Sequence, residues 1–178
     1  IAFVDTAGYN HGLTVIGSNL KELTYRNNYT NTRRLDSLDL SATPALTKVS
    51  VQQSIIDSFD FTTLTKLQEL TLNSCPNVTN IDLSKCVELK YFSYTNNNND
   101  TIESIDFSNN PNLQTVIFSN TNLKELDLSA NKYVDILSLV GTSKLQLLNL
   151  GDNPYMNQLK SIGQAESIKI VSSCLSAI

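Results

Sequence analysis

The chain repeats one pattern of hydrophobic and polar positions along most of its length. The clearest copy is Leu123 to Val134, with apolar residues at relative positions 1, 4, 6 and 12 and a small polar residue at position 9. Apolar residues two positions apart, such as Leu126 and Leu128, predict a short extended segment with one buried face. So short a strand buries little surface alone, so the copies are expected to stack and pair as a parallel sheet. The pattern therefore predicts a solenoid.

Successive copies begin mostly 11 residues apart, and two copies make a coil of about 22 residues. The copies begin at Leu20, Leu35, Leu46, Ile56, Leu67, Val78, Leu89, Ile102, Leu113, Leu123, Val134, Leu145 and Met156. This spacing resembles leucine-rich repeats of the form L-x-x-L-x-L-x-x-N/C-x-L. The resemblance covers Leu20 to Ser161. It implies a right-handed solenoid of the α/β leucine-rich-repeat class, rich in β-structure with little helix, with about seven coils.

The ends of the chain depart from the repeat. We expect one domain, with an N-terminal cap over residues 1–19, repeats over 20–161 and a C-terminal cap over 162–178. Ile168, Ile170 and Val171 are expected to form a last strand that closes the core.

The ninth position is expected to point into the turn, where a short polar side chain can satisfy backbone groups. We call the residues at this position the ladder. We interpret Cys75 and Cys86 as buried members of it, because a disulfide between them would have to join opposite edges of the coil. Leu64 is the exception. The other occupants are Asn28, Thr43, Ser54, Asn97, Asn110, Thr121, Asn131, Thr142 and Asn153. All four prolines directly follow this position, where no strand hydrogen bond is required: Pro44, Pro76, Pro111 and Pro154.

The copies fall into two alternating series. In the fixed series every copy has 11 residues, and the copies start at Leu35, Ile56, Val78, Ile102, Leu123 and Leu145. In the variable series the length runs from 10 to 15 residues, and the copies start at Leu20, Leu46, Leu67, Leu89, Leu113 and Val134. The longer copies predict protruding loops over 27–34 and 96–100 on one edge, and variable loops on a rigid scaffold favour recognition.

The outward positions also differ between the series. The fixed series repeats a Ser-Asp-Ser-like triplet, whereas the variable series changes from charged to apolar along the stack. A partner that must be distinguished requires varied chemistry, so we expect the variable series to carry the binding surface. Its candidate residues are Arg26, Lys48, Glu69, Tyr91, Ile117 and Ile136.

A column of aspartates in the fixed series raises the question of a metal. The column comprises Asp39, Asp60, Asp82, Asp106 and Asp127. Ca²⁺ requires six to eight oxygen ligands from a wrapped loop, which a flat row of single carboxylates does not supply. We expect solvated or Ser-bonded aspartates, with no metal and no cofactor.

Composition and motifs narrow the function class. A net charge of −4 with only 13 Lys and Arg residues disfavours nucleic acid, and no apolar run is long enough to span a membrane. His11 is the only histidine, and no nucleophile elbow, phosphate loop or zinc motif is present. We therefore do not expect an enzyme. Three cysteines, an odd number, do not fix the compartment.

The segments IDLSKCVEL (81–89) and IDFSNNPNL (105–113) resemble the short Asn-rich repeats of bacterial secreted or surface-anchored proteins. That resemblance implies a non-catalytic module, extracellular or on the bacterial cell surface, which binds a protein or a glycan. A lipid anchor in a longer precursor is compatible with this role. The alternative is a structural spacer or stalk that displays another domain.

Overall fold

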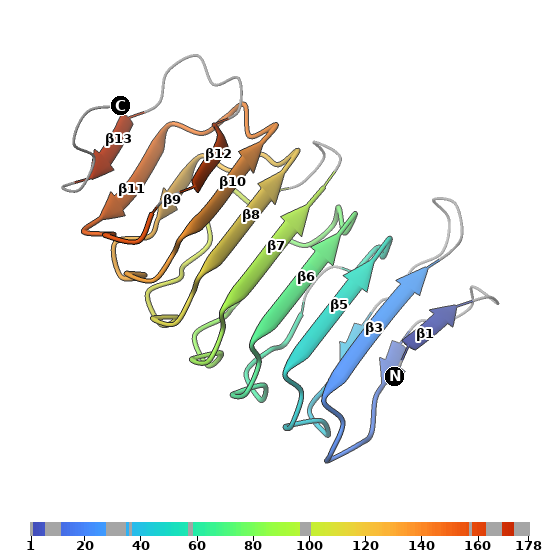
Figure 1. Ribbon diagram of the computed structural model, residues 1–178. Helices are drawn as coiled ribbons and strands as arrows, with labels where there is room; N and C mark the ends of the chain where they lie inside the picture. Colours follow the sequence, from blue (N-terminus) through green and yellow to red (C-terminus); the bar gives the residue numbers. More distant parts are fainter. Residues whose placement is uncertain are drawn as a thin grey trace.

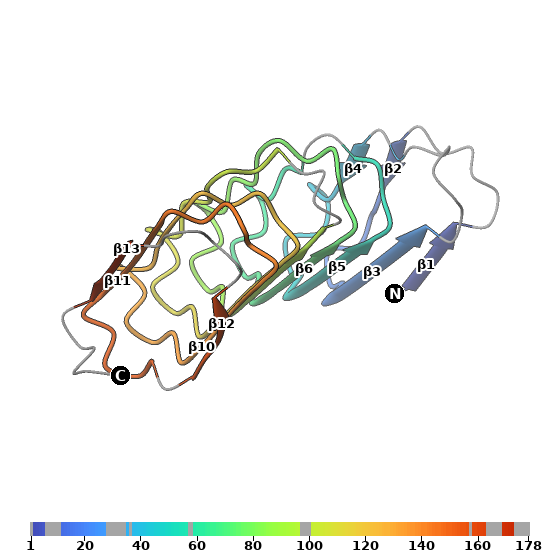
Figure 2. The same ribbon diagram turned by 90° about the horizontal axis from the view of Figure 1, so that it is seen from above.

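The computed structural model describes residues 2–5, 12–27, 35, 37–56, 59–96, 101–156, 158–162 and 169–172. The chain is a β-solenoid in which strands follow one side of a flattened coil and turns close it (Figures 1 and 2). No helix occurs among these residues, so none that could span a membrane is found in this part of the chain. The predicted solenoid is confirmed.

One long parallel sheet forms a whole side of the solenoid. Its eight strands follow the order β1-β3-β5-β6-β7-β8-β10-β12, which agrees closely with the expected seven coils. They are β1 (Ala2–Asp5), β3 (Glu22–Asn27), β5 (Lys48–Gln52), β6 (Glu69–Asn73), β7 (Tyr91–Thr95), β8 (Thr115–Ser119), β10 (Ile136–Val140) and β12 (Gln158–Ile162). From β3 to β10 all six strands belong to the variable series and pair without a register shift.

The opposite side carries two small parallel sheets, one near each end. One pairs β2 (Gly12–Thr14) with β4 (Ser37–Asp39), and the other has the order β13-β11-β9. The strands of the latter are β9 (Glu125–Asp127), β11 (Leu147–Gly151) and β13 (Lys169–Ser172). Between the two sheets, the described residues of this side form a single bridge, from Phe59 to Ile81. The expectation of a strand in every copy is therefore wrong for the middle of the fixed series.

The aspartate column explains why the fixed-series segments stay short. The carboxylate of Asp39 accepts the backbone N–H of Ser41 at 2.9 Å, and Asp82 accepts that of Ser84 at 2.9 Å. A backbone donor used in such a local turn is not available to a neighbouring strand. The chain therefore bends after about three extended residues instead of continuing the ladder.

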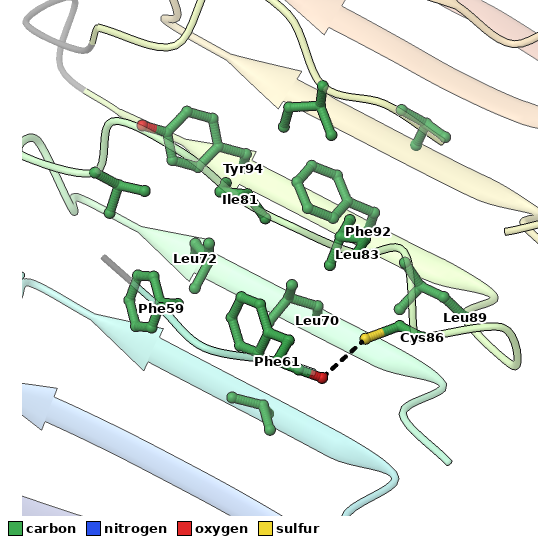
Figure 3. Packing of buried hydrophobic residues seen from close by; sticks show 14 of the residues in the cluster. Phe59, Phe61, Leu70, Leu72, Ile81, Leu83, Cys86, Leu89, Phe92 and Tyr94 are labelled. Atoms are coloured by element: carbon green, nitrogen blue, oxygen red, sulfur yellow. Dashed lines mark hydrogen bonds between the residues drawn. The ribbon is translucent and has the colours of Figure 1, made fainter. Parts of the chain in front are cut away.

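The core lies between the two sides and consists of aliphatic and aromatic side chains from every coil (Figure 3). Phe92 of β7 packs edge-on against Phe107 across the core, with ring centroids 5.1 Å apart, and contacts Phe118 of the next strand at 5.6 Å. Contact between successive coils makes the burial continuous, which is how a solenoid stabilises units too small to fold alone.

The ladder asparagines link their coils to the previous ones. The hydroxyls of Thr43 and Thr142 instead bond within their own turns, and those of Ser54 and Thr121 have no partner in the described part of the chain. The amide of Asn110 donates to the carbonyl oxygens of Leu83 and Cys86, and that of Asn131 donates to those of Phe107 and Asn110. The Cys86 thiol contacts the carbonyl oxygen of Phe61 at 3.7 Å, as the dashed line in Figure 3 shows. Each proline lies in a turn, so the predicted register is confirmed.

Two predicted ladder residues, Asn28 and Asn97, lie outside the described residues. The residues directly before them, Asn27 and Asn96, are buried. Asn96 donates to the hydroxyl oxygen of Tyr94 at 3.1 Å. The expectation that the protruding loops begin at Asn27 and Asn96 is therefore wrong, and residues 28–34 and 97–100 lie outside the described part of the chain.

The two ends continue the strand pairing. β1 and β2, within the segment expected to cap the stack, pair with β3 and β4. Of the expected last strand, Ile168 lies outside the described residues, and Ile170 and Val171 belong to β13, which pairs with β11. Ile170 and Val171 are 38% and 41% exposed, however, so the expectation that these two residues close the core is wrong.

Candidate binding surfaces

The long sheet presents three outward columns of side chains, which together we call the long-sheet face. Strand pairing places Glu22, Lys48, Glu69, Tyr91, Thr115 and Ile136 in the first column. The second column is Thr24, Ser50, Thr71, Ser93, Ile117 and Ser138. The third is Arg26, Gln52, Asn73, Thr95, Ser119 and Val140. Alternate residues point inward to the core, because side chains alternate along a strand.

All six candidate residues lie on this face, but not as one compact site. Lys48, Glu69, Tyr91 and Ile136 share the first column, Ile117 belongs to the second, and Arg26 to the third. At about 4.8 Å between strands, Arg26 on β3 and Ile136 on β10 lie five strands, or roughly 24 Å, apart. The candidates thus mark an extended surface, of the kind that contacts a macromolecule.

One pair of candidates is in direct contact. Lys48 Nζ lies 2.6 Å from Glu69 Oε2, and both side chains are partly exposed. The hydrogen bond with Glu69 and the charge of that carboxylate raise the pKa of Lys48. Arg26 instead lies in the third column, near the C-terminal end of β3. Its Nε donates to the side-chain oxygen of Gln53 at 3.3 Å. These contacts orient the charges at the N-terminal end of the face.

The chemistry of the long-sheet face changes along the stack. Charged side chains occur on β3, β5 and β6, whereas the outward residues of β8 and β10 carry no charge and include Ile117, Ile136 and Val140. Val140 is 47% exposed, and the two isoleucines are partly buried. The face therefore changes from a charged end to an uncharged end that is richer in apolar side chains.

The opposite surface is uniform. Asp60, Asp106 and Asp127 accept the backbone N–H groups of Thr62, Ser108 and Ser129, each at 2.8 Å. Hydrogen bonds from the residue two positions later lower the pKa of Asp39, Asp60, Asp82 and Asp106. The expectation of Ser-bonded aspartates is confirmed. Among the described residues no three His, Cys, Asp or Glu side chains gather as potential metal ligands.

Both ladder cysteines are buried free thiols. Burial raises the pKa of Cys75 to about 12 and that of Cys86 to about 12. Each thiol contacts a backbone carbonyl oxygen, that of Val51 for Cys75 and that of Phe61 for Cys86. The prediction that both are ladder members and not disulfide partners is therefore confirmed, while Cys174 lies outside the described residues.

A second surface was not anticipated from the sequence. Tyr133 and Tyr155 follow the ladder residues Asn131 and Asn153 by two positions, in the turns that lead toward β10 and β12 (Figure 1). Their rings stack with centroids 5.9 Å apart and an interplanar angle of 24°. The available signal was the coincidence of two tyrosines at one repeat position, which Ala45, Lys66, Glu88 and Asn112 occupy in earlier coils.

Comparison with known proteins agrees with this architecture. The structure is similar to that titled "Functional domain of InlJ from Listeria monocytogenes includes a cysteine ladder", with a TM-score of 0.53 and 21% identity. The match covers 74% of this chain and 32% of that chain, so this chain spans about a third of its length. A Leptospira interrogans LRR protein, LIC12759, matches with a TM-score of 0.30 and 12% identity over 87% of this chain and 60% of that chain. No protein-family model matches the chain, and neither does any curated protein sequence.

Proposed function

We propose that this leucine-rich-repeat solenoid is a non-catalytic recognition module of a secreted or surface-anchored bacterial protein. It binds a protein or glycan ligand through the long-sheet face, with Arg26, Lys48, Glu69, Tyr91, Ile117 and Ile136 among the contacts. In this proposal residues 1–19 and 162–178 cap a repeat domain of residues 20–161. The similarity in fold to a domain of a Listeria protein supports a bacterial binding scaffold.

The change in chemistry along the long-sheet face carries this proposal. A purely structural stack places no requirement on its outward positions beyond solubility, and the fixed series meets that requirement with repeated Asp, Ser and Thr. The long-sheet face instead combines a Lys48–Glu69 ion pair with an apolar end at Ile136. Interfaces commonly place apolar anchors beside a polar rim, and charges at the rim steer association.

The geometry suits a large ligand. Six strands from β3 to β10 pair in unbroken register, so the backbone positions that carry the outward side chains are preorganised. Preorganisation lowers the entropy lost on binding. The backbone donors and acceptors of these strands are used by their neighbours, so specificity on this face depends on the side chains.

The test combines a pull-down from cell extracts with a glycan array, both using the whole chain. The face variant carries Arg26→Glu, Lys48→Glu and Tyr91→Ala. The control variant carries Lys85→Glu and Lys144→Glu, which reverse two exposed charges in turns outside the long sheet. We expect a ligand that the wild type and the control retain and the face variant loses. Absence of any ligand would favour the spacer role, and equal retention by all three would remove the long-sheet face from the proposal.

A further inference from the structure

The tyrosine pair lies at a hollow beside the N-terminal ends of β8 and β10, outside the three columns of the long-sheet face. Five residues line it: Gln114, Tyr133, Asp135, Pro154 and Tyr155. Its volume is about 470 Å³. That volume lies within the range of roughly 300 to 1,000 Å³ that is usual for small-ligand sites. The hollow is open, as a site for part of a longer chain must be.

The turns that carry the two rings are held rigidly. Asn153 donates to the carbonyl oxygen of Asn131 at 2.9 Å, and Asn131 donates to the preceding coil. The turn that carries Tyr133 is also closed by a hydrogen bond of 3.2 Å from the backbone N–H of Val134 to the carbonyl oxygen of Asn131. Pro154 fixes one backbone angle of the second turn. The ring pair is therefore presented on the ladder itself and loses little freedom when a ligand binds.

The rings remain accessible although they touch each other. Tyr133 is 53% exposed and Tyr155 is 55% exposed, which makes them two of the most exposed large apolar side chains in the described part of the chain. An aromatic face left in water gains free energy when a ligand with an apolar surface covers it. The hollow thus has an exposed aromatic platform.

An amide side chain, that of Gln114, and a carboxylate, that of Asp135, adjoin the platform. Gln114 and Asp135 directly precede β8 and β10 and are joined by a backbone hydrogen bond of 3.0 Å. Neither side chain forms a hydrogen bond or an ion pair within the described residues. A carboxylate only accepts hydrogen bonds, an amide both donates and accepts, and a phenol does both. The hollow therefore suits a ligand that offers several hydroxyl groups around an apolar face.

We propose that this hollow binds a neutral saccharide, with a pyranose ring packed on the tyrosine platform and its hydroxyl groups bonded to Asp135 and Gln114. The C–H groups on one face of a pyranose match the negative face of an aromatic ring, and adjacent hydroxyls can donate to one carboxylate. A proline-rich peptide offers few N–H donors, so the Asp135 carboxylate would lose water without gaining a partner. An organic cation would use Asp135 and the rings but not the amide of Gln114.

The test uses the whole chain with 3-fluorotyrosine in place of tyrosine, so that ¹⁹F spectra report on each ring. Single Tyr→Phe variants assign the Tyr133 and Tyr155 signals. The probes are neutral hexaoses of glucose, mannose and N-acetylglucosamine. Tetramethylammonium and a deca-proline peptide serve as competing ligand classes. We expect at least one hexaose at about 10 mM to shift both signals, a concentration suited to weak single-site binding.

Variants then place the ligand. Tyr133→Ala and Tyr155→Ala are each expected to weaken hexaose binding about tenfold or more, and Asp135→Asn to weaken it by a smaller factor. Ile16→Ala, at an exposed apolar residue in the N-terminal part of the chain, is the control and should leave binding unchanged. A response to tetramethylammonium or deca-proline alone, no hexaose response, or binding that survives Tyr133→Ala and Tyr155→Ala would overturn the assignment. None of these outcomes removes the long-sheet face as a recognition surface, since that face is tested by other variants.

Discussion

Asn131 and Asn110, one coil apart, are joined by a hydrogen bond of 2.8 Å from the side-chain amide of Asn131 to the backbone carbonyl oxygen of Asn110. The same amide donates to the carbonyl oxygen of Phe107 at 3.0 Å. One side chain thus connects two turns in the buried interior of the solenoid. The ladder therefore stabilises the stacking of coils as well as the bend within each coil.

Removing this connection should destabilise the fold. Asn131→Ala loses two buried hydrogen bonds and leaves a small void, so we expect the free energy of unfolding to fall by about 2 kcal/mol. Urea unfolding followed by circular dichroism measures it. Asn109→Ala, at an exposed position beside the ladder, is the control and should change stability by less than about 0.5 kcal/mol. Equal effects at the two positions would contradict a structural role for the ladder.

Extending the asparagine ladder by one coil should stabilise the protein. Cys86 occupies the position equivalent to Asn110 in the preceding coil, but its thiol makes only a weak contact of 3.7 Å with the carbonyl oxygen of Phe61. An amide there would reach the carbonyl oxygens of Phe61 and Leu64, as Asn110 reaches those of Leu83 and Cys86. We expect Cys86→Asn to raise the free energy of unfolding by about 1 kcal/mol and Cys86→Ala to lower it. Destabilisation by both substitutions would show that side-chain volume, and not hydrogen bonding, governs this position.

The aspartate column predicts a loss of stability in acid. Hydrogen bonds to Asp60, Asp82 and Asp106 lower their pKa in the folded state from the ordinary value of 3.8. A lowered folded pKa contributes stability that is present above the unfolded pKa and is lost as pH falls toward the folded pKa. We therefore expect the urea midpoint to be constant above about pH 5 and to fall below about pH 4.

A triple variant isolates this contribution. Asn can accept the same backbone hydrogen bond without titrating, so Asp60→Asn, Asp82→Asn and Asp106→Asn together should flatten the decline below about pH 4. Asp152→Asn removes an exposed carboxylate outside the column and serves as the control. A triple variant with the same acid sensitivity as the wild type would remove the column as its source.

Much of the fold was predictable because the repeat couples local pattern to stacking. Leu126 and Leu128 predict an extended segment, and the position of Asn131 predicts a ladder residue, since a short polar side chain can satisfy backbone groups in the bend. Leu64 shows the limit. It is buried in the ladder without a side-chain hydrogen bond, because backbone bonds close its turn: one from its own N–H to Phe61 and one from the N–H of Leu67 to its carbonyl oxygen.

The other features of the fold and of the candidate surfaces depend on side-chain contacts that repeat spacing alone does not reveal. In the fixed series, aspartate side chains capture backbone N–H groups, as Asp82 does with that of Ser84, and this limits the length of each extended segment. The hollow beside Tyr133 and Tyr155 requires residues from neighbouring coils to meet, and it lies in turns that the hydrophobic pattern does not constrain. The long-sheet face could be located from the sequence, whereas the ion pair between Lys48 and Glu69 required the strand register.

The most direct test of the long-sheet face as a recognition surface is the affinity of the captured ligand for two matched variants. Ile117→Asp with Ile136→Asp adds two charges to the apolar end of the long-sheet face. Asn80→Asp with Ser104→Asp adds the same charge to exposed positions on the opposite surface. With folding verified by thermal melting, isothermal titration calorimetry should show Kd increased about tenfold or more for the first variant and unchanged for the second. An unchanged Kd for the first variant, with weaker binding by the second, would place recognition on the other side of the solenoid.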